Sequence, residues 1–96
     1  MLDKLYEAQK KMKEVKERLD KISVAGKAGN DEVVVDMNGN LRITAVKISD
    51  ALMATGDKEQ LEDLITVACN RAIESAQNVA QAEMAAASKG LLPGIF

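Results

Sequence analysis

The residues with the most chemical potential in this 96-residue chain are the basic side chains near its start. Residues 1–21 hold seven basic and five acidic residues, a net charge of +2, although the whole chain carries −2. On a helix, cations seven residues apart lie about 10.5 Å apart along one side. Flexible side chains at such intervals can contact successive phosphates of a duplex. The candidate phosphate contacts are Lys4, Lys10, Lys11, Lys13, Lys16 and Arg18, with Arg71 and Lys89 as weaker candidates.

This basic stripe has a second interpretation. With Leu5 as heptad position a, Lys4, Lys11 and Arg18 fall at position g, where charged residues often pair with acids of a neighbouring helix. A charge run is also commonly just a solvated helix face. The acids interleaved with these cations weaken binding by one copy, and duplication in a dimer would restore it through avidity. The sequence alone leaves both interpretations open.

The composition offers few residues for catalysis or metal binding. The chain has no histidine, and its one cysteine, Cys69, stands among apolar residues, which favours a packed thiol over a nucleophile. The acids Asp57, Glu59, Glu62 and Asp63 fall at a predicted helix start, where they complement the helix dipole without a metal. We therefore expect no enzyme, cofactor, metal or small-molecule substrate.

The composition also limits the kind of partner. No apolar run reaches the roughly 18 residues of a membrane span, and the first residues lack the apolar centre of a signal peptide. We expect a cytoplasmic protein with no membrane partner. Tyr6 and Phe96 are the only aromatic residues, too few to stack the bases of a single strand. Contact with the backbone of double-stranded DNA is the remaining nucleic-acid mode.

The elements that must position these residues begin with a helix predicted over 2–21. Helix-forming polar residues fill the positions between its apolar ones, and no Gly or Pro interrupts it. The apolar residues recur at alternating spacings of three and four, the seam of a coiled coil. They are Leu5, Ala8, Met12, Val15, Leu19 and Ile22.

Three strands are predicted within 22–48, where the apolar period changes to two. Residues that accept positive φ separate them. The expected segments are 22–24, 32–37 and 41–48, with turn residues at Gly26, Gly29 and Asn30 and at Asn38-Gly39-Asn40.

The register of the second hairpin stays open. A two-residue turn sets the apolar side of segment 32–37 against the even-numbered residues of segment 41–48, and a three-residue turn with a bulge sets it against Leu41, Ile43 and Ala45. A bulge inside 41–48 would combine the two.

A long helix is predicted over 58–89, opened by a capping box of Asp57 and Gln60 and ended by Gly90 as its C′ residue. Before it, residues 49–56 connect through one helical turn that stops at Gly56, and residues 90–96 form a tail. A stripe of Ala68, Ala72, Ala76 and Ala80 lets another element approach this helix closely.

The resulting fold class is α+β, a single α-β-β-β-α domain over 1–96 with a small antiparallel sheet and two helices. A chain of this length buries only about 60–68% of its unfolded surface, which leaves apolar faces uncovered. We expect a homodimer joined through the sheet. The expected interface residues are Val33, Val35, Met37, Leu41 and Ile43.

An ordered set of short segments runs through the chain at consistent spacing: Ala8-Gln9-Lys10-Lys11-Met12, Asn38-Gly39, Val46-Lys47-Ile48, Leu52, residues 58–65, Ala68-Cys69-Asn70-Arg71-Ala72, Met84 with Gly90, and Leu92-Pro93-Gly94. This set resembles the YbaB/EbfC family of bacterial nucleoid-associated proteins. The resemblance implies a tweezer-like homodimer that binds double-stranded DNA with little sequence preference in the nucleoid and affects gene expression. Compared with that family, we expect no Gly/Met-rich leader before the first helix, and the chain has Arg71 where an acid is commoner.

An alternative is a coiled-coil interaction or chaperone-like protein with no DNA binding, similar to prefoldin in its helix-hairpin-helix order. A first helix of about 20 residues is too short to pair along the whole predicted second helix, which disfavours symmetric tentacles.

Overall fold

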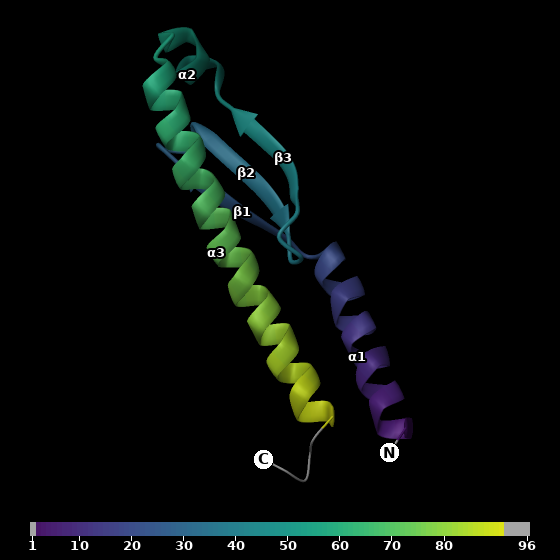
Figure 1. Cartoon of the computed structure of the whole chain (residues 1–96). Helices are drawn as coiled ribbons and strands as arrows, with labels where there is room; N and C mark the ends of the chain where they lie inside the picture. The colour runs from purple at the N-terminus through teal and green to yellow at the C-terminus, as the bar shows by residue number, and fades with distance from the viewer. Residues whose placement is uncertain (1, 92–96) are drawn as a thin grey trace.

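The computed structural model describes the backbone of residues 2–91 and the side chains of residues 3–89 (Figure 1). A three-stranded antiparallel sheet lies against one face of a long helix, and a shorter helix continues from the sheet alongside that long helix (Figure 1). The α+β class and the α-β-β-β-α order are therefore confirmed. The elements are α1 (Leu2–Lys21), β1 (Ser23–Ala28), β2 (Val33–Asn38), β3 (Ile43–Ile48), α2 (Asp50–Thr55) and α3 (Lys58–Leu91).

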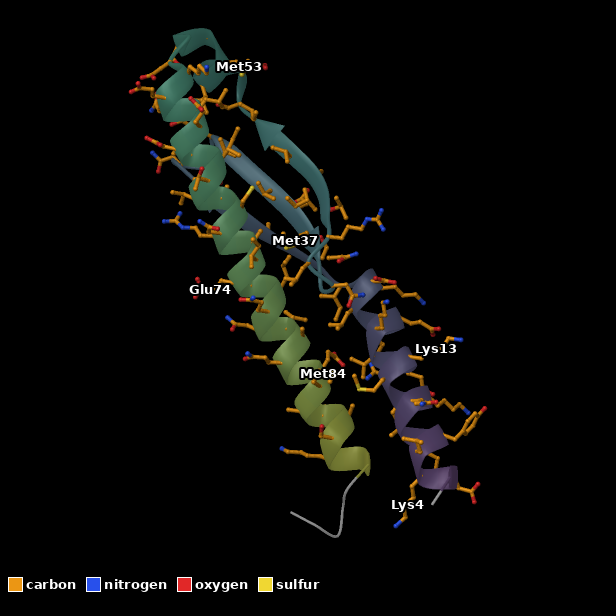
Figure 2. The ribbon with its side chains drawn as sticks, viewed as in Figure 1. Lys4, Lys13, Met37, Met53, Glu74 and Met84 are labelled. Atoms are coloured by element: carbon orange, nitrogen blue, oxygen red, sulfur yellow. The ribbon has the colours of Figure 1, made fainter. Side chains whose placement is uncertain are left out.

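The core lies between the sheet and α3. Met37 of β2 points into it (Figure 2), together with the alternate β2 residues Val33 and Val35. Strict alternation of buried and half-buried residues along β2 follows from its period of two. Because α3 packs mainly on β1 and β2, the same face of β3 is left largely uncovered.

The strand β1 is longer than the predicted segment, because Gly26 lies inside it and not in a turn. A Cβ at Gly26 would overlap the carbonyl oxygen of Ala68 and the backbone nitrogen of Ala72 in α3. Both alanines are fully buried. Glycine on the strand and alanine on the helix thus bring the two backbones into direct contact, which is the close approach that the alanine stripe predicts.

The hairpin of β2 and β3 combines the two registers that the sequence leaves open. Beside the turn Met37 pairs with Ile43, as a three-residue turn requires, and Leu41 takes a φ of 66° there. The register then shifts, so that Val35 pairs with Val46. This bulge keeps apolar residues of β3 on the same side as the core-facing residues of β2.

Capping residues define α2 and the start of α3. The Ser49 hydroxyl accepts the Leu52 N–H at 3.1 Å, and Gly56 ends α2 with a φ of 67°. The Asp57 carboxylate accepts the Gln60 N–H at 3.0 Å, which is the N-cap half of the predicted capping box. The helical turn expected between residues 49 and 56 is confirmed.

The predicted end of the long helix is wrong by two residues. Helix α3 continues through Gly90 to Leu91, so Gly90 is not its C′ residue. A glycine inside a helix costs only about 1 kcal/mol, whereas a proline disfavours the helical conformation of the residue before it. Pro93 is therefore the stronger stop signal in this stretch. The predicted tail residues 92–96 lie outside the described residues.

The apolar seam of α1 is used in its second half. Val15 and Leu19 are buried against the C-terminal part of α3, where Ala87 lies. Leu5 and Met12 are 57% and 44% exposed. The two helices run antiparallel, so the first turns of α1 lie level with the last described turn of α3 (Figure 1). The C-terminal half of α1 is therefore the more firmly packed, although Ala8 in the other half is also half-buried.

The molecule is elongated, with extents of 61 × 21 × 15 Å and a radius of gyration of 18.2 Å. A compact domain of 100 residues has a radius of gyration of about 13 Å. The accessible surface is 6978 Å², against about 5,400 Å² for a compact monomer of this mass. The chain thus exposes more surface than a self-contained domain of its size. No helix within residues 2–91 is both long and apolar enough to cross a membrane.

Candidate nucleic-acid interface

The six basic candidates of α1 are all exposed, but they do not share one face. Val15 and Leu19 define the buried side of the helix. At 100° per residue, Lys4, Lys11 and Arg18 follow one border of that side. The remaining three point outward or along the other border: Lys10, Lys13 and Lys16.

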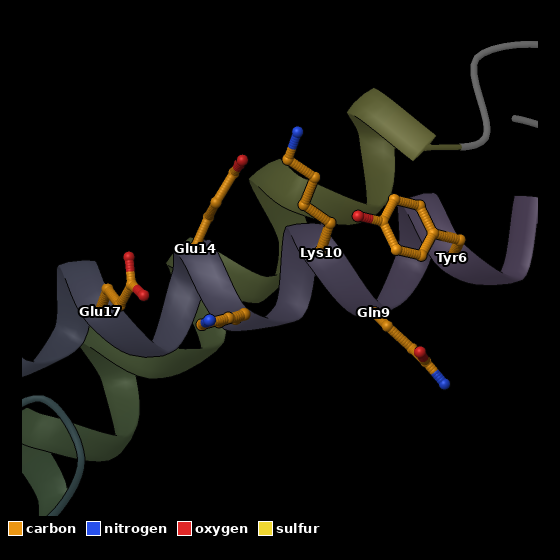
Figure 3. A pocket seen from close by; sticks show the side chains of 6 residues that line it. Tyr6, Gln9, Lys10, Glu14 and Glu17 are labelled. Carbon is orange, nitrogen blue, oxygen red and sulfur yellow. The ribbon is translucent and has the colours of Figure 1, made fainter. Parts of the chain in front are cut away.

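The outward face of α1 carries both signs of charge. Figure 3 shows Tyr6, Lys10, Glu14 and Glu17 rising from the same side of the helix, while Gln9 points the other way. These residues and Lys13 line a shallow surface hollow. All of its lining residues belong to one helix, so it is bounded on one side only and does not enclose a small molecule.

Arg18 is already engaged within the protomer. Its Nε lies 3.1 Å from Oε2 of Glu83 on α3, and both side chains are partly exposed. This is the pairing that the coiled-coil interpretation predicts for a g position. Lys11 has a looser partner, with Nζ 3.8 Å from Oε2 of Glu14. Lys4 has no ion pair with any of the described acids.

The two weaker candidates lie in different places. The Arg71 Nη1 donates a hydrogen bond to the Lys27 carbonyl at 2.6 Å, so Arg71 covers the outer edge of β1, away from α1. A covered edge strand is protected from pairing with another chain. Lys89 is exposed in the last turn of α3, at the end of the molecule where α1 begins (Figure 1). The structure therefore groups Lys89, and not Arg71, with the α1 cations.

Charge is separated along the length of the molecule. The end opposite the start of α1, where Met53 lies in Figure 2, is built from the β1–β2 turn, α2 and the beginning of α3. The Ser49 N–H donates to the Glu32 carbonyl at 2.8 Å and joins these segments. Seven acids and one base give this end a net charge of −6, whereas α1 carries +2. The acids are Asp31, Glu32, Asp50, Asp57, Glu59, Glu62 and Asp63, and the base is Lys58.

Of the five residues predicted for a dimer interface, three are covered inside one protomer. Val33, Val35 and Met37 are no more than 1% exposed beneath α3. Leu41 and Ile43 are 47% and 46% exposed and remain accessible.

Val46 is also 47% exposed, and sequence reasoning missed it as an interface residue. The face of the sheet on which Val46 lies depends on the β-bulge, because one extra residue exchanges the two faces for the residues that follow it. Ile43 and Val46 of β3 and Leu41 just before it are exposed apolar residues, and we call these three residues the β3 strip.

The described residues contain no buried polar or charged side chain, and the hollow on α1 is open. An elongated shape, an open hollow and an exposed basic helix favour binding of a macromolecule on the surface over binding of a small molecule, which usually needs an enclosing cleft. The chain is a member of the YbaB/EbfC DNA-binding family, whose model matches residues 1–91. The resemblance found in the sequence is thus confirmed, and this family is a DNA-binding family and not an enzyme family.

Relatives support the assignment over nearly the whole chain. A nucleoid-associated protein of Afipia carboxidovorans is 38% identical over 96 residues, which cover 99% of this chain and 91% of the relative. A nucleoid-associated protein of Desulfotalea psychrophila is 36% identical over 91 residues, covering 95% and 86%. The crystal structure of an uncharacterized Helicobacter pylori protein has the same fold, with a TM-score of 0.74, 22% identity and coverage of 80% and 81%.

Proposed function

We propose that this protein is a homodimer that binds double-stranded DNA in the bacterial nucleoid with little sequence preference, and so affects nucleoid organisation and gene expression. The observation that carries the proposal is the separation of charge along a molecule 61 Å long. The basic helix α1 lies toward one end, and a cluster of net charge −6 occupies the other.

Separation over this length lets the basic end act independently of the net charge. At 0.1 M salt the Debye length is about 10 Å, so exposed charges several times farther apart are largely screened from one another. The overall charge of −2 therefore does not prevent α1 from approaching a polyanion. The acidic end is repelled by DNA, which favours an approach with α1 foremost.

The cations are suited to phosphate contacts. Lys10 and Lys13 have no ion pair with the described acids and point into solvent, and lysine on a flexible stem binds phosphate as a point charge. Lys4, Lys11, Lys16 and Lys89 extend the same end of the molecule. Arg18 must leave Glu83 before it can contribute, and Arg71 must leave the β1 edge. Contacts with phosphates carry no sequence information, so binding is expected to be largely sequence-independent.

Dimerisation is proposed through the β3 strip. The strip is apolar, half-exposed and not covered by α3, and β3 is an edge strand. An exposed apolar edge strand tends to pair with another chain. A second copy that covers the strip would place two α1 helices on one particle, and two weak contacts on one DNA molecule gain affinity through effective concentration.

The test is duplex binding across a series of salt concentrations on unrelated sequences. If the dimer neutralises about eight phosphates, log affinity falls with log salt at a slope of roughly −7. Lys13→Gln removes one outward cation per protomer and is expected to make the slope less negative by about 2 per dimer. Lys58→Gln is the matched control, since it makes the same charge change at the acidic end.

Equal effects of Lys13→Gln and Lys58→Gln would refute the assignment of the contact to α1. No binding to any duplex at low salt, together with retention of an unfolded client protein, would favour the chaperone-like alternative.

A further inference from the structure

The C-terminal end of α1 is capped by a segment far away in the sequence. A helix leaves its last carbonyls without partners inside the helix. The Gly39 N–H, in the β2–β3 turn, donates to the Leu19 carbonyl at 2.9 Å and to the Ile22 carbonyl at 3.1 Å. A Cβ at Gly39 would lie 2.8 Å from Leu19 Cδ2 and 2.9 Å from its carbonyl oxygen. Only a residue without a side chain lets the turn approach this closely.

The next residue of the turn adds a second link. The Asn40 Nδ2 donates to the Lys16 carbonyl at 2.9 Å and also to the Asp20 carboxylate. Amide donors are favourable at a helix C-terminus, which is the negative end of its dipole. The turn itself is held by the Asn38 side chain, whose Oδ1 accepts the N–H groups of Asn40 and Arg42 at 2.9 and 3.1 Å.

The other contact that holds α1 is its packing along α3. Val15 and Leu19 are buried there with Ala87, next to the half-buried Val79 and Ala80, and Arg18 pairs with Glu83. Apolar packing of this kind is non-directional, whereas the hydrogen bonds of the turn fix an orientation. A helix of 20 residues is about 30 Å long, so a tilt of 10° about its C-terminal end moves its start by about 5 Å. Such a displacement exceeds the reach of a hydrogen bond and would carry a lysine off its phosphate.

We propose that the β2–β3 turn sets the direction of α1, with Gly39 and Asn40 as positioning residues for the DNA-binding helix. The proposal rests on the proposed function, because it assigns the turn a role in the same contact. It goes beyond that function in naming residues that touch no DNA and yet determine how many phosphates α1 reaches.

The test has one readout without DNA and one with it, both on the full-length protein well below its melting temperature. Asn40→Ala removes both side-chain links of the turn to α1. Residual dipolar couplings of backbone amides report the direction of α1 relative to α3, and we expect averaged couplings in α1 with unchanged couplings in α3. In duplex binding, we expect the Kd to rise roughly 5- to 10-fold, which is the fold-change that corresponds to the net free energy of about one hydrogen bond. The salt slope should become less negative by about 2 per dimer.

Controls separate positioning from general stability. Asn70→Ala removes an exposed asparagine whose side chain has no hydrogen bond with the described residues, and should leave both readouts at wild-type values. Asn40→Asp sets a second carboxylate beside Asp20 and should act like Asn40→Ala. Adding Asp20→Asn supplies an amide donor to the new carboxylate and should restore the couplings in part, because the link to the Lys16 carbonyl stays lost.

Unchanged α1 couplings in Asn40→Ala would overturn the proposal, whatever the DNA result. Averaged couplings with a wild-type Kd and slope would also overturn it, because the direction of α1 would then not matter for the contact. The proposed function is judged separately, by whether the wild-type protein binds duplex DNA and whether Lys13→Gln alters the slope.

Discussion

Replacing Gly26 by alanine tests the packing of β1 against α3, the contact that holds the sheet on the long helix. The new Cβ would overlap backbone atoms of Ala68 and Ala72, which have no side-chain freedom with which to move away. The two backbones must separate by on the order of 1 Å, and a gap of that size forfeits a quarter to a half of each dispersion contact across it.

The expected loss of stability is about 3 kcal/mol, at the upper end for overpacking because backbone meets backbone. Alanine loses less backbone entropy than glycine on folding, and this offsets only about 0.5–1 kcal/mol of that loss. For a domain of 60–100 residues, each kcal/mol shifts the melting temperature by about 4–8 °C. The net loss is about 2–2.5 kcal/mol, so Gly26→Ala is expected to melt about 8–20 °C below the wild-type protein.

A second glycine supplies the control. Gly56→Ala meets no atom within 4 Å, and its only strain is the φ of 67°, which costs an alanine roughly 1 kcal/mol. Melting is followed by circular dichroism at one protomer concentration, because dissociation of a dimer makes the midpoint depend on concentration. A melting temperature of Gly26→Ala equal to or above that of Gly56→Ala would refute the close-packing argument.

Three further predictions follow from burial and charge. Val35→Asp places an unpaired carboxylate in the core, at a cost of several kcal/mol, and should abolish the folded circular dichroism signal; a cooperative transition near the wild-type temperature would contradict it. Ile43→Asp places a charge in the exposed β3 strip and should give a folded monomer in sedimentation. A variant that stays dimeric, or a wild-type protein that is monomeric, would refute dimerisation through the strip. Glu83→Gln frees Arg18 and removes an acid beside α1, at a stability cost of only about 0–1 kcal/mol because the pair is half-exposed. Since the β2–β3 turn still holds α1, this variant should bind duplex DNA more tightly at 0.1 M salt; weaker binding would show that the pair is needed to hold α1.

The distribution of charge explains why composition is a poor guide to the partner of this protein. A net charge of −2 does not suggest a DNA-binding protein. Dividing the sequence at residue 21 already exposes the basic helix, but it spreads the acids over the remaining chain. Folding gathers seven of those acids at one end, since the β1–β2 turn, α2 and the start of α3 meet there.

The sequence by itself determined the features that depend on near neighbours along the chain. The alternation of three and four in apolar spacing predicted α1, and the short apolar period predicted the strands. Ser49, Gly56 and Asp57 marked helix ends through bonds that span three residues or fewer. These features need only local geometry, so the α+β class and the order of elements could be deduced from the residues.

The tertiary structure decided the features that depend on which distant segments meet. The bulge in β3 brought Val46 into the exposed strip, and the packing of α3 buries Val33, a predicted interface residue, inside one protomer. Gly26 lies against α3 and not in a turn, and Arg18 pairs with Glu83, which is 65 residues away in the sequence. The turn at Gly39 became the cap of α1. A side chain's partner is set by the path of the whole backbone, whereas residue types in sequence specify only which partners it could accept.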